Sequence, residues 1–454
     1  MEHQILTMIK ISVLPLLIVL LGCAKKEGKI QWITLDPGHF HAALVQKKMY
    51  PEIDAEVHIY APESNDLDLH LSRIQGYNQR MENPTSWKST IYNKEDFLEA
   101  MLVNEQSGVV MLSGNNQKKT EYILKAIQNG FHVYADKPMV MDPEEYKSLE
   151  TAFQIADKKK LLLYDIMTER FEITTILQKK ISQMEDVFGT LVKGDLEAPA
   201  IVKSSIHHYA KDVSGKPLIR PAWFFDTKQQ GEGLVDVSSH LVDLTFWECF
   251  PDQAILKEDI ELLNADRWAT KLSKDNFKQV TGLSSYPNYL KPYVENDTLL
   301  INANGALQYT LHGHHAKVEV LWNFIAPEGT GDTHYSIMRG SKATLEILQT
   351  QEENYIPTLY VNPNQDFDFK ALQKIVHRLD KEYPGIMLIK KQDRWEVRIP
   401  DELREGHEAH FAQVTKRFIE FYKNQKIPAW EITNMLTKYH LTTRALEFAQ
   451  TIKN

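Results

Sequence analysis

The chain has little cysteine and no long basic run. Two cysteines among 454 residues cannot form a disulfide framework. Its 52 Lys and Arg against 61 Asp and Glu give a net charge of −9, which offers no electrostatic footprint for nucleic acid. A hydrophobic fraction of 43% and a charged fraction of 25% exclude a mostly disordered chain and one with many membrane spans. The length predicts two or three domains.

Long apolar runs are also missing, apart from residues 9–21, which are too few to span a bilayer comfortably. This run ends in Leu-Leu-Gly-Cys at Cys23 and resembles the signal of a bacterial lipoprotein, with Met8 a better start than Met1. A plain secretory signal or a buried helix is the alternative. We therefore expect a signal over residues 1–22, lipidation of Cys23, a tether over 23–29, and an exported protein anchored at the cell envelope.

From residue 30 to residue 166, strand and helix patterns alternate. Strands are predicted at 30–35, 55–60, 108–112, 131–135 and 161–166, with helices at 39–49, 93–103, 118–129 and from 142. This alternation predicts an α/β domain with a doubly wound parallel sheet, whose ligands lie beyond the carboxyl ends of the strands.

The pattern changes over residues 167–454. Strands are predicted at 201–207, 306–312, 317–324 and 344–348, and helices at 171–184, 411–424 and 430–452. We expect an α+β domain with a large, open and mostly antiparallel sheet. Residues 366–400 are charged, have no clear place in that sheet, and are predicted to be an insertion.

The tripeptide Asp136-Lys137-Pro138 follows a predicted buried strand. This places Lys137 at the carboxyl end of the sheet, and Pro138 biases it away from helical geometry. A lysine there can hold a substrate hydroxyl and stabilise a developing alkoxide. The alternative is a solvated loop lysine beside a turn proline.

Glycines at residues 231–233 lead into an apolar run that contains Asp236 and His240. Because they are four residues apart, we expect them on one face of a helix, with Asp243 close to the same stripe. A neighbouring carboxylate would set the tautomer and basicity of His240, the natural general base near neutral pH. The alternative is a satisfied His–Asp pair in the core.

Two histidine pairs resemble metal ligands, His39 with His41 after the first strand and His312 with His314 on a strand. Neither pair is joined in the sequence by further ordered carboxylate and histidine ligands, so no metal site is predicted. We expect these histidines to line a ligand cleft or to lie at the surface.

Aromatic and polar groups gather at residues 206–209 and 220–225. His207, Arg220 and Trp223 suit a carbohydrate cleft, because sugars are bound by aromatic faces and hydrogen-bonding side chains. The alternative for Trp223 is packing in the core.

The order of these motifs resembles the Gfo/Idh/MocA oxidoreductases, which include glucose–fructose oxidoreductase and inositol dehydrogenase. The resemblance rests on Val-Val-Met-Leu-Ser-Gly-Asn at 109–115, on 130–138, on 231–243 and on Met-Arg-Gly-Ser-Lys-Ala-Thr-Leu-Glu at 338–346. It implies a Rossmann-like first domain and hydride transfer between a sugar carbinol and NAD or NADP. Lys137, Asp236 and His240 match the family's catalytic residues, with His240 taking the hydroxyl proton. The implied substrate is a small-molecule sugar or glycoside, and the open sheet could support a homo-oligomer.

The resemblance also implies a set of cofactor-binding residues, which are Gly38, His39, Phe40, Ser113, Asn115, Asp136, Lys137 and Pro138. The phosphate turn departs from the family pattern of Gly-x-Gly-x-x-Gly or Ala, because Asp36-Pro-Gly-His-Phe-His41 keeps only the middle glycine. Asp36 brings a carboxylate to the place where a phosphate should sit. Asp136 replaces the glutamate of the family's Glu-Lys-Pro motif.

Export would limit the supply of free dinucleotide, so an exported enzyme would capture its cofactor tightly and recycle it within one catalytic cycle. The alternative is a cofactor-free, carbohydrate-binding lipoprotein of a glycan-uptake system. A metal hydrolase is a third and weaker hypothesis.

Overall fold

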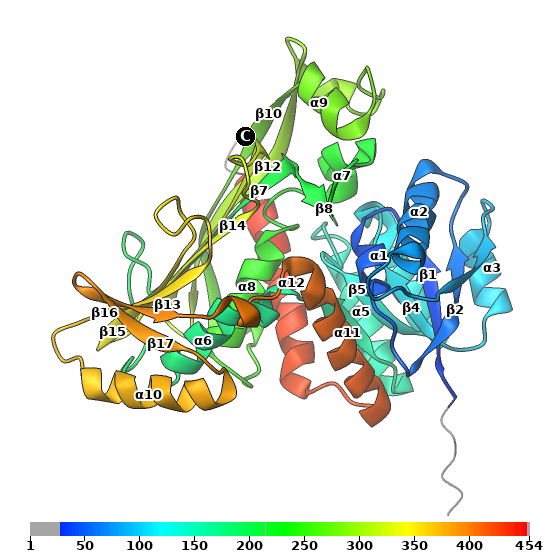
Figure 1. Ribbon diagram of the computed structural model, residues 1–454. Helices are drawn as coiled ribbons and strands as arrows, with labels where there is room; N and C mark the ends of the chain where they lie inside the picture. The colour runs from blue at the N-terminus through cyan, green and yellow to red at the C-terminus, as the bar shows by residue number, and fades with distance from the viewer. Residues whose placement is uncertain (1–27, 214, 452–454) are drawn as a thin grey trace, which may run out of the picture.

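The computed structural model describes residues 28–213 and 215–451, which form two large sheets joined by helices (Figure 1) and a small two-stranded sheet of β8 (Asp212–Val213) and β9 (Lys216–Pro217). The predicted signal, Cys23 and most of the predicted tether lie outside these residues. Within the described part of the chain, no helix is both long and apolar enough to cross a membrane.

The first sheet has six parallel strands in the order β3-β2-β1-β4-β5-β6, which confirms the predicted doubly wound α/β domain. The strands are β1 (Ile30–Leu35), β2 (Ile53–Tyr60), β3 (Lys88–Tyr92), β4 (Val109–Leu112), β5 (His132–Asp136) and β6 (Leu163–Ile166). The strand order switches between β1 and β4, because β2 and β3 lie on one side of β1 and β4 to β6 lie on the other. A crevice at their carboxyl ends is where such folds bind ligands.

Helices α1 (His41–Val45), α2 (Asn65–Gln79), α3 (Phe97–Asn104), α4 (Lys119–Gln128) and α5 (Tyr146–Lys159) connect these strands. Helix α1 is much shorter than the predicted 39–49. Its first residue follows Phe40, which supplies no side-chain cap. Helix α2 was not predicted, although Ser64 caps it by accepting a hydrogen bond from the backbone N–H of Leu67.

The second sheet has ten strands and confirms the predicted large, mostly antiparallel architecture. Its main path runs through β10 (Ile260–Ser273), β12 (Thr298–Leu311), β13 (His314–Ile325), β7 (Ile201–Ala210), β14 (Thr333–Arg339), β15 (Ala343–Leu348), β16 (Thr358–Pro363), β18 (Arg394–Arg398) and β17 (Met387–Lys391), while β11 (Val294–Glu295) pairs with β12. Strands β13 and β7 are parallel. The other neighbours, as far as the structure describes them, are antiparallel. Helices α6 (Ile173–Ser182) and α8 (Ser238–Cys249) contact this sheet.

Residues 366–400 do have a place in that sheet, so this part of the prediction is wrong. They form α10 (Phe369–Glu382), β17 and β18, and β18 pairs with β16. The prediction failed because it rested on the charged composition and overlooked the amphipathic pattern of α10. Its buried side chains recur with helical spacing, and they are Leu372, Ile375, Val376 and Leu379.

The last two helices return to the first domain. Figure 1 shows α11 (His407–Asn424) and α12 (Ala429–Thr451) between the two sheets. Phe411 and Phe418 of α11 belong to the core of the first sheet, and the ring of Phe418 stacks on Tyr134 of β5 with centroids 4.6 Å apart. The end of α12, from Leu441 to Ala449, packs into the core of the second sheet. The two domains therefore share their C-terminal helices.

Candidate active site

A cavity of about 820 Å³ lies at the carboxyl edge of the first sheet and is closed by the second. Its lining includes His39 and Lys137 from the first domain, His240 from α8, and His207 and Trp322 from the second sheet. The segment that leads into α11 also contributes. The cavity therefore brings together residues that are far apart in the sequence, as expected at a domain interface.

Lys137 and Asp236 form the centre of this cavity. The Nζ atom of Lys137 lies 2.5 Å from Oδ1 of Asp236, and the two side chains are 9% and 5% exposed. The other carboxylate oxygen of Asp236 accepts a hydrogen bond from Nε2 of Gln230 at 3.0 Å. Buried charges need such partners, so this pair holds the lysine ammonium at one position on the cavity wall.

The spacing predicted that Asp236 and His240 share one helical face, and this prediction is wrong. It lies in the turn before α8, which begins at Ser238. The turn persists because Gly231 has a φ of 103° and because a Cβ on Gly233 would lie 2.1 Å from the carbonyl oxygen of Ala303. As a result, Asp236 binds Lys137 rather than His240.

His240 faces the cavity and is neutral at physiological pH. Burial, together with the nearby charge of Lys137, lowers the pKa of His240 to about 3. The charge of Glu169 opposes that shift. Burial raises the pKa of Glu169, but its hydrogen bond to His407 holds that pKa well below its usual range. The lone pair of a neutral imidazole can accept a proton and the charge of Glu169 favours the protonated ring, but the lowered pKa makes His240 a weaker base than a free histidine.

Asp243 lies outside the site. Its carboxylate binds Arg170 through two hydrogen bonds of 2.5 and 2.7 Å and binds Lys438 at 3.0 Å. Arg170 in turn donates to Glu431. This buried ion network joins α8 to α12 and is structural.

The turn after β1 adopts an unusual conformation for a phosphate-binding loop. Asp36 has a φ of 47°, in the left-handed region where glycine is favoured, and its carboxylate accepts a hydrogen bond from the Tyr122 hydroxyl at 3.0 Å. The backbone N–H groups of Gly38 and His39 both donate to the carbonyl oxygen of Ser113, at 3.2 and 3.1 Å. These two donors are therefore already satisfied by Ser113, the residue that follows β4.

The space over Gly38 is filled by side chains. A Cβ built on Gly38 would lie 3.0 Å from Oδ2 of Asp66 and 3.0 Å from Cζ2 of Trp223. The indole Nε1 of Trp223 donates to the same Asp66 oxygen at 2.6 Å. Trp223 was predicted to bind substrate, but it does not line the cavity. It covers the glycine that should admit a pyrophosphate.

Trp223 belongs to residues 222–230, here named the crossing segment, which comprise η3 (Ala222–Phe225), Asp226 and α7 (Thr227–Gln230). This segment of the second domain lies against the first at three further points. The ring of Phe224 stacks on His39 with centroids 6.0 Å apart. Asn115 donates to the side chain of Gln229 at 2.7 Å, and Asn116 donates to the carbonyl of Gln230 at 2.6 Å.

A nicotinamide dinucleotide fits this site at one end and not at the other. Lys137, Asp236 and His240 line a cavity whose volume of about 820 Å³ is in the range of ligand-binding pockets. The pyrophosphate path over Gly38 is covered by the crossing segment and faces the Asp66 carboxylate. Burial raises the pKa of Asp66 to about 6, so near neutral pH this group would repel a phosphate. Binding of the whole dinucleotide requires Trp223 and Asp66 to move.

The predicted substrate residues His207 and Arg220 do line the cavity. His207 stacks on Trp322 with centroids 5.1 Å apart, and its two ring nitrogens lie near Asp332 and Ser205. Arg220 donates to two backbone carbonyls, at 2.8 and 2.9 Å, so its guanidinium mainly supports the wall.

Several lining residues were not predicted, and these are Glu169, Trp322, Asp332, His334 and His407. They come from separate strands, loops and a C-terminal helix without a common motif. The signal that could have found Trp322 is its place on a strand predicted over 317–324.

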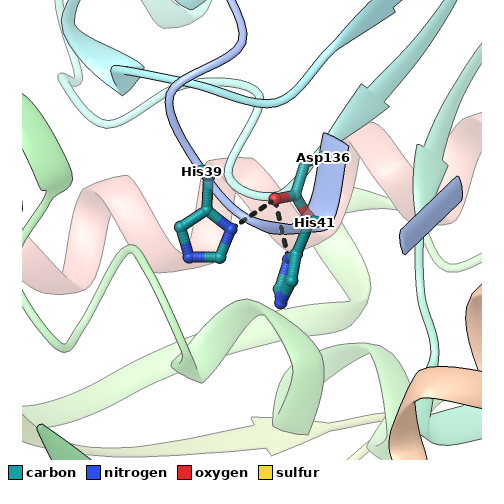
Figure 2. Close-up of side chains that lie close together, drawn as sticks. All are labelled: His39, His41 and Asp136. Atoms are coloured by element: carbon teal, nitrogen blue, oxygen red, sulfur yellow. Dashed lines mark hydrogen bonds and ion pairs between the residues drawn. The ribbon is translucent and has the colours of Figure 1, made fainter. Parts of the chain in front are cut away.

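The two histidine pairs have different surroundings. Figure 2 shows Nδ1 of His41 and Nδ1 of His39 pointing to the same oxygen of Asp136, at 2.9 and 3.5 Å. The carboxylate that joins this pair lies 95 residues from His41, so no local sequence motif could show it. His312 and His314 lie at the turn between β12 and β13, near Asp259 and the carbonyl of Val192, and do not line the cavity.

Comparison with known proteins agrees with this architecture. Residues 177–450 match the family described as "Putative oxidoreductase C terminal domain", and residues 55–164 match the one described as "Oxidoreductase family, NAD-binding Rossmann fold". A solved structure described as a "putative oxidoreductase" from Parabacteroides merdae is 51% identical, with a TM-score of 0.91 over 94% of this chain and 98% of that one.

Two more distant proteins share parts of this similarity. A D-glucoside 3-dehydrogenase from Escherichia coli (strain K12) is 26% identical over 196 residues, which are 40% of this chain and 47% of that enzyme. The match thus spans less than half the length of that curated relative. Levoglucosan dehydrogenase in complex with NADH has the same fold, with 12% identity and a TM-score of 0.59 over 93% of this chain and 97% of that one. The chain belongs to the Gfo/Idh/MocA oxidoreductase family, whose first domain is an NAD-binding Rossmann fold.

Proposed function

We propose that this protein is a dehydrogenase that oxidises a secondary hydroxyl group of a glycoside with NAD or NADP. The observation that carries the proposal is the placement of Lys137, paired with Asp236, and of His240 on one cavity of about 820 Å³. The name of the E. coli relative favours the 3-hydroxyl of a D-glucoside. The face of Trp322 and the polar lining suit a sugar ring.

Each of the three residues has a separate task. The Lys137 ammonium donates a hydrogen bond to the substrate oxygen and stabilises the alkoxide character that develops there. Asp236 holds that ammonium in place. His240 accepts the hydroxyl proton on a ring nitrogen, and its Nδ1 forms no hydrogen bond within the described part of the chain. When bound, the nicotinamide supplies the acceptor for the hydride that leaves the carbinol carbon.

A panel of glycosides tests this proposal. Purified protein would be incubated with NAD or NADP and with methyl glucoside, cellobiose or maltose, and products would be followed by mass spectrometry as a loss of two mass units, the mass of the two hydrogens removed. Formation of a keto-glycoside that depends on Lys137 and His240 supports the proposal. Sugar binding without oxidation of any glycoside would instead favour the second candidate, a cofactor-free carbohydrate-binding protein. The observation that supports this candidate is the covering of Gly38 by Asp66 and Trp223.

We further propose that the protein is exported, lipid-anchored through Cys23, and retains its dinucleotide through each catalytic cycle. The Leu-Leu-Gly-Cys sequence supports the anchor, and a crossing segment that could close over a bound cofactor supports retention. Radiolabelled palmitate should label the wild-type protein and not Cys23→Ser. Dinucleotide released from protein recovered from the membrane would be measured by mass spectrometry, and its absence would contradict retention.

We also propose self-association through the second sheet, as the open sheet suggested. Light scattering after size-exclusion chromatography would measure it. A mass equal to one chain at micromolar concentration would exclude this association.

A further inference from the structure

Three ligand atoms of the first domain converge at the edge of the cavity (Figure 2). Nδ1 of His41 is 2.9 Å and Nδ1 of His39 is 3.5 Å from Oδ2 of Asp136, and the three atoms lie within 4.8 Å of one another. Zinc bonds to nitrogen and oxygen measure about 2.0–2.2 Å, so two ligands of a tetrahedral ion lie about 3.3 Å apart. The two measured separations from the carboxylate fall on either side of that value.

Hydrogen bonding alone does not satisfy this cluster. Oδ2 of Asp136 already receives bonds from His41 and from the Ser113 hydroxyl, at 2.9 and 3.0 Å. Nδ1 of His39 points to the same oxygen but forms no hydrogen bond within the described residues, although it is shielded from solvent. A cation between the two nitrogens and the carboxylate would satisfy all three groups.

Asp136 is held in position by groups that would form an outer shell. The backbone N–H of Lys137 donates to Oδ1 at 3.0 Å, and the Ser113 hydroxyl donates to Oδ2. Such partners orient ligands in metal sites. The two nearby ammonium groups each have another partner, since Lys119 donates to the Asp136 carbonyl at 3.0 Å and Lys137 binds Asp236.

We propose that His39, His41 and Asp136 form a binding site for a divalent transition-metal cation, with zinc as the expected occupant. Two imidazoles and one carboxylate are a donor set that zinc takes, and three protein ligands leave a position open for water. Both histidines line the cavity, so the open position faces the space in which a sugar would bind. This proposal departs from the expectation of no metal and does not depend on the dehydrogenase activity.

Metal content of the purified protein tests the site. The full chain would be prepared without a polyhistidine tag, stripped with a chelator, and titrated with ZnCl₂ in a calorimeter. We expect about one zinc per chain that survives gel filtration, and CoCl₂ should give the visible absorption of a low-coordinate site. Binding should weaken on the order of 100-fold or more in His41→Ala and in Asp136→Asn.

His58→Ala is the matched control, because His58 also contacts a carboxylate, Glu105, in the same domain but outside the cavity. It should bind zinc as the wild-type protein does. Thermal unfolding would verify that each variant is folded, and the wild-type titration decides the question if a variant is not. Absence of zinc binding by folded wild-type protein, or equal binding by both cluster variants, would overturn the site. Dinucleotide measured on the same samples separates this outcome from failure of the proposed dehydrogenase.

Discussion

The ligand edge of the first sheet has two regions with opposite character. On the cavity side, Lys137 faces open space with its counter-ion Asp236 beside it. On the turn side, Gly38 lies beneath Trp223 and Asp66, and its N–H already donates to the carbonyl oxygen of Ser113. The difference arises from the side chains over each region, and over Gly38 these are Asp66 of α2 and Trp223, which reaches across from the second domain.

This contrast separates two demands on a dehydrogenase. Chemistry at a hydroxyl group requires a proton acceptor and a positive charge, and the cavity side supplies both. Holding a dinucleotide requires free N–H groups and a neutral or positive turn, and the turn side supplies neither in this conformation. Variants on each side should therefore change different quantities.

The largest effect is expected on the cavity side, for Lys137→Met. Removal of the ammonium leaves the developing alkoxide without its donor, and the turnover number should fall by roughly 1,000-fold or more. Glycoside oxidation would be followed with saturating NAD. Lys125→Met, on the exposed surface of α4, is the control and should leave turnover unchanged. Comparable activity in both variants would remove Lys137 from the mechanism.

A smaller loss is expected for His240→Gln, roughly 100- to 1,000-fold in turnover, because water can replace part of the function of a general base. The Michaelis constant for the glycoside should change little. A variant that loses affinity while keeping turnover would indicate a binding role for His240 instead.

On the turn side, Trp223→Ala should strengthen dinucleotide binding by about tenfold, because the covering ring no longer has to be displaced. Isothermal titration with NAD would measure the change. Trp322→Ala is the matched control, since it removes an indole from the cavity and should weaken sugar binding without improving NAD binding. If Trp223→Ala binds NAD more weakly than the wild-type protein, the ring is part of the cofactor site rather than its cover.

The smallest effect concerns the Asp66 carboxyl group and pH. Burial raises its pKa from 3.8 to about 6 in the folded protein, so this group favours folding below pH 4 and loses that contribution as the pH rises through about 6. The Asp66→Asn variant does not undergo this loss. The difference in free energy of unfolding between the variant and the wild type should therefore shift in favour of the variant by about 1 kcal/mol between pH 4 and pH 8, allowing for partial exposure. Buried histidines such as His70, whose pKa is lowered to about 3, act in the opposite direction, so the difference between variant and wild type is the quantity to follow in urea unfolding.

Local sequence patterns were enough to predict much of the fold and part of the candidate site. Alternating strands and helices identified the doubly wound sheet, and the Lys137 tripeptide at a strand end identified one member of the proposed catalytic pair. Asp236 was also found, but its pairing with Lys137 was not, because a salt bridge between residues 99 positions apart leaves no periodic pattern in the sequence. Trp223 and Trp322 have similar local chemistry in the sequence. Packing between the domains decided which of them faces the cavity.

The contact of Asp136 with His39 and His41 was not predicted either, because these residues are far apart in the sequence. Asp136 and His41 both replace residues of the family pattern, and each replacement is unremarkable alone. In three dimensions the short carboxylate and the imidazole fill one space, with a hydrogen bond of 2.9 Å between them. Such coupled changes become visible only when strand β5 lies beside the first turn.

The return of α11 and α12 to the first domain has a consequence for the order of folding. The strands of that domain leave the ribosome early, yet Tyr134 finds its stacking partner Phe418 only when the end of the chain has been made. Closing the first core over so long a separation is slow, because the intervening chain must be ordered first. The core of the first domain is therefore complete only once the last helices of the chain have been made.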